Sequence, residues 1–136
     1  MMVTPLYAGL LVLLFIMLSF RVIHSRRGRK ISLGDGGNPA MLRVIRGHAN
    51  FVEYVPLALL LMVILEISRF SIYALHALGI LLVVGRLLHG YALSFAEHSR
   101  FGRTVGAALT IIVLLVEAVL CLYQAFLAHS VWFRIQ

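Results

Sequence analysis

The stretch TVGAALTIIVLLVEAVLCLYQAFLA, from Thr104 to Ala128, carries one charged side chain, Glu117, in a run of mostly apolar residues. A helix needs roughly 20 residues, at about 1.5 Å of rise each, to cross about 30 Å of hydrocarbon. Three earlier stretches are similarly apolar: Val3–Phe20, a stretch centred on Val55–Leu65, and Ser71–Leu93. The sequence therefore predicts one membrane domain, residues 1–136, with spans at about 3–23, 39–68, 71–95 and 103–129.

The overall composition points the same way. Of the 136 residues, 62% are hydrophobic and only 12% are charged, whereas a soluble domain carries about 25% charged residues. Four spans and short connections take up nearly the whole chain, so we expect no separate soluble domain. Short connections make neighbouring helices antiparallel, and the predicted fold class is therefore all-α: an up-down bundle of four transmembrane helices.

The basic residues of the loops are concentrated in two of the three connections, and the connection between the second and third spans offers only Arg69, with Glu66 nearby. The net charge is +7, and Arg26, Arg27, Arg29 and Lys30 follow the first span, while Arg100 and Arg103 lie between the third and fourth. Because an excess of Lys and Arg in short loops marks the cytoplasmic side, we expect both termini to lie outside the cytoplasm. This distribution favours topology and contact with anionic membrane lipids over nucleic-acid binding.

The polar loop from His24 to Gly37 is followed by Asn38-Pro39, a helix start with Asn as the N-cap and Pro in the first turn. A helix from Pro39 to Ser68 is roughly 45 Å long, about ten residues more than the hydrocarbon needs. Its first three turns therefore lie at the cytoplasmic interface or in a cavity that opens there. Pro56 removes one backbone hydrogen bond further along this helix, and we expect a kink.

A polar stripe runs along the first half of this helix. At about 100° per residue, Arg43, Arg46, Asn50, Glu53 and Tyr54 share an arc of about 100°. Ionisable groups at membrane depth face a bundle interior or a wet cavity, because exposure to lipid is costly. The stripe therefore faces another part of the protein, or a ligand.

Two interpretations of this stripe remain open. In the structural one, Arg46, Asn50 and Glu53 neutralise one another; Glu53 is about two turns from Arg46, so direct contact is strained and Asn50 would have to bridge them. In the functional one, the surplus of arginine meets an anionic ligand that enters from the cytoplasm, since the guanidinium fork suits carboxylates. Glu53 would then pair with an ammonium group of that ligand.

The third span adds Arg86 and His89, three residues apart and hence on one helix face. Arg86 lies deep in the apolar run, and either contacts a ligand or forms a structural pair with Glu53. We predict no metal site, because the remaining histidines show no ligand spacing: His24, His76, His98 and His129. Glu117 in the fourth span is an intramembrane acid to which the sequence assigns no role.

The pattern Arg43-x-x-Arg46-x-His48-x-Asn50-x-x-Glu53-Tyr54-x-Pro56 resembles the signature of the MAPEG family, the membrane-associated proteins of eicosanoid and glutathione metabolism. Gly34-Asp35-Gly36-Gly37-Asn38-Pro39 resembles its bacterial branch, and Arg86-x-x-His89 late in the third span fits as well. The resemblance covers essentially the whole chain. It implies a bacterial inner-membrane protein that forms a homotrimer, with glutathione bound between adjacent subunits near the cytoplasmic face.

Carried over residue by residue, the resemblance implies that glutathione is held by side chains of the second and third spans. Glutathione has two carboxylates, one ammonium and a thiol, which suits surplus arginine beside one acid. His48 matches a position that contacts glutathione in some relatives, although its angular offset of about 140° favours a packing contact between helices. The implied glutathione-binding residues are Arg43, Arg46, His48, Asn50, Glu53, Tyr54, Arg86 and His89.

Arg103 is the candidate catalytic residue. A free thiol with a pKa near 8.5 is only slightly ionised at pH 7, and a nearby cation lowers that pKa. Arg103 precedes Thr104 at the start of the fourth span, where the prostaglandin synthase branch has Arg before Ser or Thr, and a helix N-terminus adds positive potential. A simple topology role for Arg103 remains open, and Arg100 is a weaker candidate. Leu93 stands where the leukotriene branch has arginine, which weakens a specific eicosanoid assignment.

The resemblance thus implies a membrane glutathione transferase or peroxidase, with glutathione as co-substrate and an apolar, lipid-soluble second substrate of unknown identity. Two alternatives remain. One is a family member without catalysis that binds lipid or assists a partner protein. The other is a small transporter subunit with Arg46, Glu53 and Arg86 along an ion path.

Overall fold

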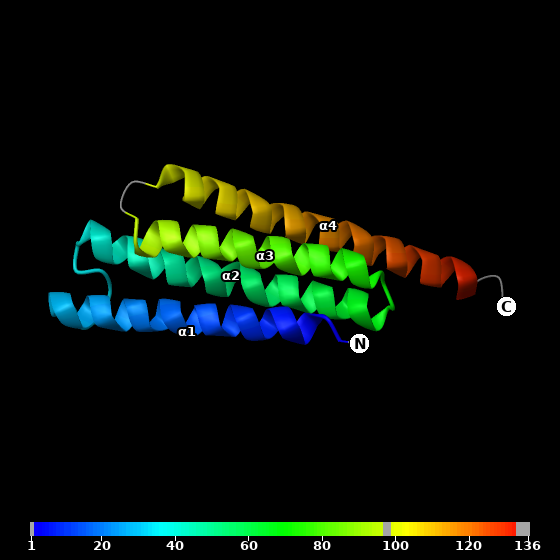
Figure 1. Ribbon diagram of the computed structural model, residues 1–136, viewed down its shortest axis with the longest axis horizontal. Helices are drawn as coiled ribbons and strands as arrows, with labels where there is room; N and C mark the ends of the chain where they lie inside the picture. The colour runs from blue at the N-terminus through cyan, green and yellow to red at the C-terminus, as the bar shows by residue number, and fades with distance from the viewer. Residues whose placement is uncertain (1, 97–98, 133–136) are drawn as a thin grey trace.

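The computed structural model describes residues 2–96 and 99–132, the last five of these by their backbone alone. Four long helices run up and down: α1 (Thr4–Arg29), α2 (Pro39–Ile67), α3 (Ile72–Ser94) and α4 (Arg100–Trp132). All four are long and apolar enough to cross a membrane. The α1–α2 and α3–α4 connections lie at one end of the bundle, here called the loop end, and both termini lie at the other, the terminal end (Figure 1). The predicted four-helix membrane bundle is confirmed.

The first helix is longer than its apolar run. The helix continues through the basic segment and ends at Arg29. Lys30, the residue that caps it, has a left-handed φ of 56°. The prediction that the polar loop begins at His24 is therefore wrong. The segment from His24 to Arg29 contains no proline, and its one glycine, Gly28, costs the helix only about 1 kcal/mol. Exposed basic side chains can be solvated while the backbone hydrogen bonds continue. Beyond the helix, Arg26 Nη1 donates to the Gly34 carbonyl at 2.6 Å and so ties the loop back to α1.

The second helix begins where the sequence predicts. The Asn38 side-chain oxygen accepts hydrogen bonds from the Ala40 and Met41 amides, both at 3.0 Å, and Pro39 occupies the first helical position. These bonds satisfy amides that have no partner inside the helix. The start of α2 is therefore fixed, and with it the register of the polar stripe along that helix.

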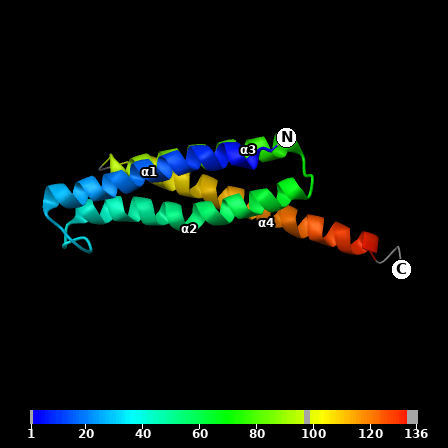
Figure 2. The same ribbon diagram turned by 90° about the horizontal axis from the view of Figure 1, so that it is seen from below.

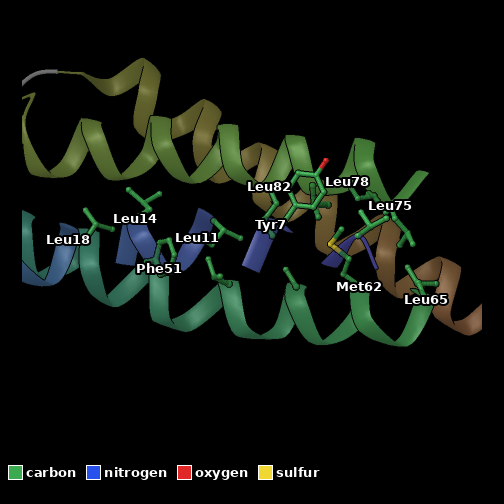
Figure 3. Close-up of a cluster of buried hydrophobic side chains, with 14 residues drawn as sticks. Tyr7, Leu11, Leu14, Leu18, Phe51, Met62, Leu65, Leu75, Leu78 and Leu82 are labelled. Atoms are coloured by element: carbon green, nitrogen blue, oxygen red, sulfur yellow. The ribbon is translucent and has the colours of Figure 1, made fainter. Parts of the chain in front are cut away.

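The core is a continuous apolar seam between the helices, drawn in Figure 3. Leucines of α1 and α3 face Phe51, Met62 and Leu65 of α2. Buried members of the seam include Leu11, Leu14, Leu18, Leu75, Leu78, Leu82 and Val113. Most other large apolar side chains are exposed on the outer faces of the helices, as expected of a surface that meets lipid.

Glycines set the close approach of α3 and α4. A Cβ at Gly106 would lie 2.5 Å from the Gly85 carbonyl oxygen and 2.6 Å from the His89 amide nitrogen. Only a residue without a side chain fits at position 106, so α3 and α4 pack in close contact toward the loop end. At the terminal end α4 runs on past the other helices (Figures 1 and 2).

Candidate functional site

A groove at the loop end is lined by three helices, α2, α3 and α4. It has a volume of about 330 Å³, within the usual range for small-molecule sites. Its polar wall is largely basic, and we call it the arginine groove. The lining residues are Leu42, Arg43, Arg46 and Asn50 of α2, His89 and Leu93 of α3, and Arg103 of α4.

Close helix packing builds the groove. A Cβ at Gly47 would lie 3.2 Å from the Leu93 Cβ, so the glycine lets α3 approach α2 beside the groove. Gly106 does the same for α3 and α4. The helices thereby bring Arg43 and Arg46 to the same groove as Arg103, which lies about sixty residues later in the chain.

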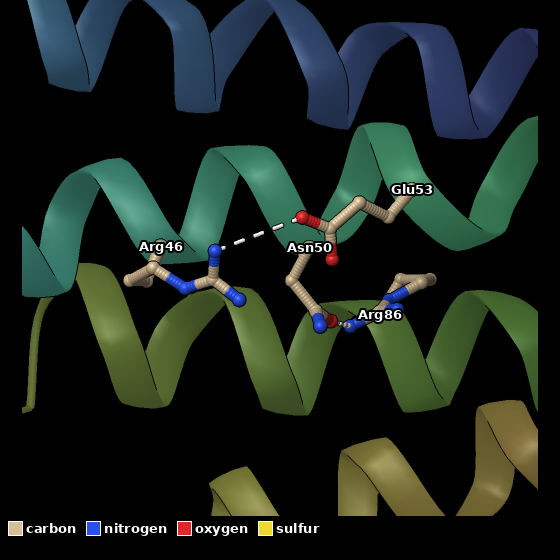
Figure 4. A network of polar contacts seen from close by, with 4 residues as sticks. All are labelled: Arg46, Asn50, Glu53 and Arg86. Carbon is tan, nitrogen blue, oxygen red and sulfur yellow. Dashed lines mark hydrogen bonds and ion pairs between the residues drawn. The ribbon is translucent and has the colours of Figure 1, made fainter.

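A smaller cavity of about 30 Å³ lies deeper in the bundle and shares Asn50 with the groove. Arg86 lines it and is buried, with 1% of its surface exposed. Its Nη2 donates to Asn50 Oδ1 at 3.0 Å (Figure 4), while Nε and Nη1 have no hydrogen-bond partner in the described part of the chain. Tyr54 and Thr110 complete the polar lining. Arg86 thus contacts Asn50, and the structure shows no ion pair between Arg86 and Glu53.

The bond to Arg86 also orients Asn50. Because the amide oxygen accepts from the guanidinium, the two N–H groups of the Asn50 amide remain as donors. Asn50 forms part of the groove wall as well. The hydrogen bond to the buried Arg86 therefore leaves the NH₂ group of the Asn50 side chain free to donate to an acceptor atom of a ligand in the groove.

Arg46 and Glu53, at the exposed edge of the polar stripe of α2, contact each other directly. Arg46 Nη1 lies 3.7 Å from Glu53 Oε1 (Figure 4), so the expectation that Asn50 must bridge them is wrong; the long arginine side chain extends along the helix and spans the two turns. Arg46 is 56% exposed and Glu53 48% exposed. Ion pairs of this kind contribute little to stability, and a ligand can compete for either partner.

His89 links α3 to the first turn of α4. It is 5% exposed, and its Nδ1 donates to the main-chain carbonyl of Arg103 at 3.0 Å, since a carbonyl oxygen can only accept. This bond holds the backbone of Arg103 beside the groove while the Arg103 side chain is exposed. A further cavity of about 440 Å³ adjoins the groove, lined by Arg43, Arg100 and Arg103 among others. Arg100 thus lies beside the groove and not in its wall.

His48 lies apart from the other predicted ligands. Its Nε2 is 3.0 Å from the Ser19 hydroxyl, and its ring lies beside Phe15. Both partners belong to α1, on the opposite side of α2 from the groove. The structure therefore gives His48 the helix-packing contact that its angular offset indicated, and we leave it out of the site.

Thr110 and Arg21 were not predicted from the sequence. Thr110 lines the inner cavity, with its hydroxyl bonded to the Gly106 carbonyl at 2.9 Å; its place seven residues after Arg103, on the same helix face, could have identified it. Arg21 donates to the Ser94 carbonyl at 3.1 Å and lies over the Phe95 ring at 5.0 Å. No sequence signal pairs these two segments.

The MAPEG family model matches residues 4–123. The chain belongs to the MAPEG family. Two MAPEG relatives, the inner membrane protein YecN of Escherichia coli strain K12 and that of Escherichia coli O6:H1 strain CFT073, are each 41% identical over 90 residues. That alignment covers 66% of this chain and 69% of each relative.

The comparisons decide the family and the location. The polar stripe of α2 predicted a member of the MAPEG family, and the family match confirms that prediction. Four apolar helices and an inner-membrane relative also confirm an integral, multi-pass protein of the bacterial inner membrane. Both relatives are named only as inner membrane proteins.

Proposed function

We propose that this protein is a membrane-embedded glutathione transferase or peroxidase that binds glutathione in the arginine groove. The observation that carries the proposal is the charge of that groove: Arg43, Arg46 and Arg103 line it, and Arg86 lies behind Asn50. Two carboxylates of glutathione match this surplus, and the family is one of glutathione metabolism.

The polar groups of the groove suit separate parts of the tripeptide. Arg46 is exposed and offers its guanidinium to a carboxylate. Glu53 lies outside the groove lining, but its ion pair with Arg46 holds it nearby, where it offers an acceptor to the ligand ammonium. The free N–H groups of Asn50 suit a further carboxylate or carbonyl oxygen. Glutathione would thereby replace the weak ion pair between Arg46 and Glu53 with one charge-assisted hydrogen bond to each of these side chains.

Arg103 would stabilise the thiolate. Its exposed side chain stands in the groove wall at the start of α4, and a cation beside a thiol favours the ionised form. In the transfer reaction the thiolate sulfur forms a bond to an electrophilic carbon, and the leaving group departs with the electrons of its bond. In the peroxidase reaction two glutathione molecules are oxidised to the disulfide, while a hydroperoxide is reduced to an alcohol and water.

The homotrimer belongs to the same proposal. Arg46 and Glu53 are both about half exposed, and Glu53 lies beyond the first three turns of α2, in the part that we expect hydrocarbon to surround in a single chain. Charged groups facing lipid are costly, so a second copy of the chain is the fitting cover for this face of α2. Glutathione would then lie between subunits, open to the cytoplasm at the loop end, with both termini on the far side of the membrane.

Detergent-purified protein tests the proposal with glutathione and an aryl halide as a generic electrophile. Arg103→Ala should reduce kcat much more than glutathione affinity, whereas Arg46→Ala should weaken binding itself. Arg27→Ala removes a charge from an exposed site on α1, outside the groove lining, and serves as the control that changes neither. Saturable binding without turnover would instead favour a non-catalytic member. Ion flux in liposomes that is insensitive to glutathione would favour a transporter subunit.

A further inference from the structure

The inner cavity behind Asn50 has a buried cation in its wall. Its volume is about 30 Å³, which is room for one or two water molecules or one monatomic ion. The arginine groove, by contrast, has about 330 Å³. Glutathione is therefore too large to enter the inner cavity, and the polar side chains there need another explanation. The lining residues are Asn50 and Tyr54 of α2, Arg86 of α3, and Ala107, Thr110 and Ile111 of α4.

Arg86 has more donors than partners. It is 1% exposed, and its Nη2 donates to Asn50 Oδ1 at 3.0 Å (Figure 4). Its Nε and Nη1 have no partner among the residues that the structure describes. Buried donors without acceptors are costly, because folding removes their water and puts nothing in its place. The guanidinium therefore needs an acceptor that the described part of the chain does not supply.

The charge of Arg86 is unbalanced as well. Within residues 2–96 and 99–132 no carboxylate forms an ion pair with its guanidinium, and Glu53, the acid of the polar stripe, pairs with Arg46 at 3.7 Å instead. A buried cation without a counter-charge is costly at membrane depth. A water molecule would accept from the free donors but leave the charge, whereas an anion does both.

The other walls of the inner cavity suit an anion. None of the lining residues is acidic. Tyr54 has a hydroxyl that can donate, and Asn50 keeps two amide N–H groups because its oxygen accepts from Arg86. Tyr54 is half-buried and Ile111 is exposed, so the cavity reaches the surface of the bundle and an ion can exchange.

We propose that the inner cavity binds one monatomic anion of the size of chloride, held against the guanidinium of Arg86. The ion accepts from the donors that lack a partner and balances the buried charge. Larger anions are excluded by the volume of about 30 Å³. A bound ion would fix Arg86, and through the hydrogen bond also Asn50, before any ligand enters the arginine groove.

The test uses full-length protein in detergent without glutathione, so its outcome is independent of the proposed function. Sodium gluconate is replaced stepwise by sodium chloride at constant ionic strength, and the midpoint of thermal unfolding is measured. Gluconate is too large for the inner cavity, and a ligand that binds only the folded state raises the midpoint. We expect a saturable rise of about 3–6 °C when chloride reaches about ten times its Kd.

Three variants place the effect in the inner cavity. Arg86→Met removes the charge and should abolish the difference between chloride and gluconate. Tyr54→Phe removes one hydroxyl and should raise the half-saturating chloride concentration about three- to tenfold. Arg46→Ala, in the arginine groove, should leave the chloride effect unchanged.

Equal unfolding midpoints in chloride and gluconate would overturn the proposal, because the cavity would then hold water alone. An undiminished chloride effect in Arg86→Met, or in Tyr54→Phe where Arg86→Met does not fold, would overturn it as well. Loss of the effect in Arg46→Ala would show that chloride acts in the arginine groove, with the same consequence.

Discussion

Replacing Asn50 by aspartate tests the arginine groove at its most constrained contact. Asn50 Oδ1 accepts from the buried Arg86, and its amide N–H groups remain for the ligand. In Asn50→Asp one carboxylate oxygen can keep the bond to Arg86, but the other presents negative charge to the groove in place of donors. We expect glutathione to bind more weakly while the fold stays intact.

The expected magnitudes follow from the two bonds. Loss of one hydrogen bond to a charged ligand group costs about 1.5–3 kcal/mol, which corresponds to roughly a ten- to hundredfold rise in Kd. Repulsion between carboxylates adds to this loss. The bond to Arg86, by contrast, becomes an ion pair between two charged groups and is therefore stronger, so the midpoint of thermal unfolding should hold or rise.

Calorimetric titration with glutathione and thermal unfolding in detergent measure the two quantities. Asn50→Leu should weaken binding and also lower stability, because it leaves Arg86 without its acceptor. His48→Gln, on the α1 side of the same helix, should change glutathione affinity little. Wild-type affinity in Asn50→Asp would refute the reasoning, and so would a loss of stability equal to that of Asn50→Leu.

Three further substitutions, one of them a control, test how the helices are held. Gly106→Ala places a methyl group within 2.6 Å of the His89 amide nitrogen, so it should destabilise the bundle by about 1–3 kcal/mol and reduce turnover. Gly28→Ala, whose Cβ would meet nothing within 4 Å, should be neutral or stabilising in the same unfolding assay. Glu66→Ala removes the carboxylate that accepts from the Val3 and Thr4 amides and should cost about 1–2 kcal/mol. Faster hydrogen exchange in the first turn of α1 would report that loss, whereas unchanged exchange would contradict it.

The four helices could be predicted because the length and apolar character of a span are one-dimensional properties. The start of α2 could be predicted for a similar reason, since Asn38 and Pro39 act on their immediate neighbours. The end of α1 could not, because the apolar run ends where the hydrocarbon ends, while the helix continues through solvated side chains to Arg29. Hydropathy locates the membrane boundary and not the helix boundary.

In the candidate site too, positions along a single helix could be predicted from the sequence, whereas contacts between helices could not. The angular positions along α2 placed Arg46 and Asn50 together and set His48 apart, because one helix fixes its own faces. Contacts between helices were beyond the sequence. The Asn50–Arg86 bond and the hydrogen bond from His89 to the Arg103 carbonyl depend on how α2, α3 and α4 pack. The surroundings of Glu117 depend on the same packing.

Glutathione binding by the purified protein tests the central claim most directly. A calorimetric titration should show saturable binding that Arg46→Ala weakens and Arg27→Ala leaves unchanged. Absence of saturable binding at millimolar glutathione, or equal affinity in both arginine variants, would contradict the assignment of the arginine groove as a glutathione site.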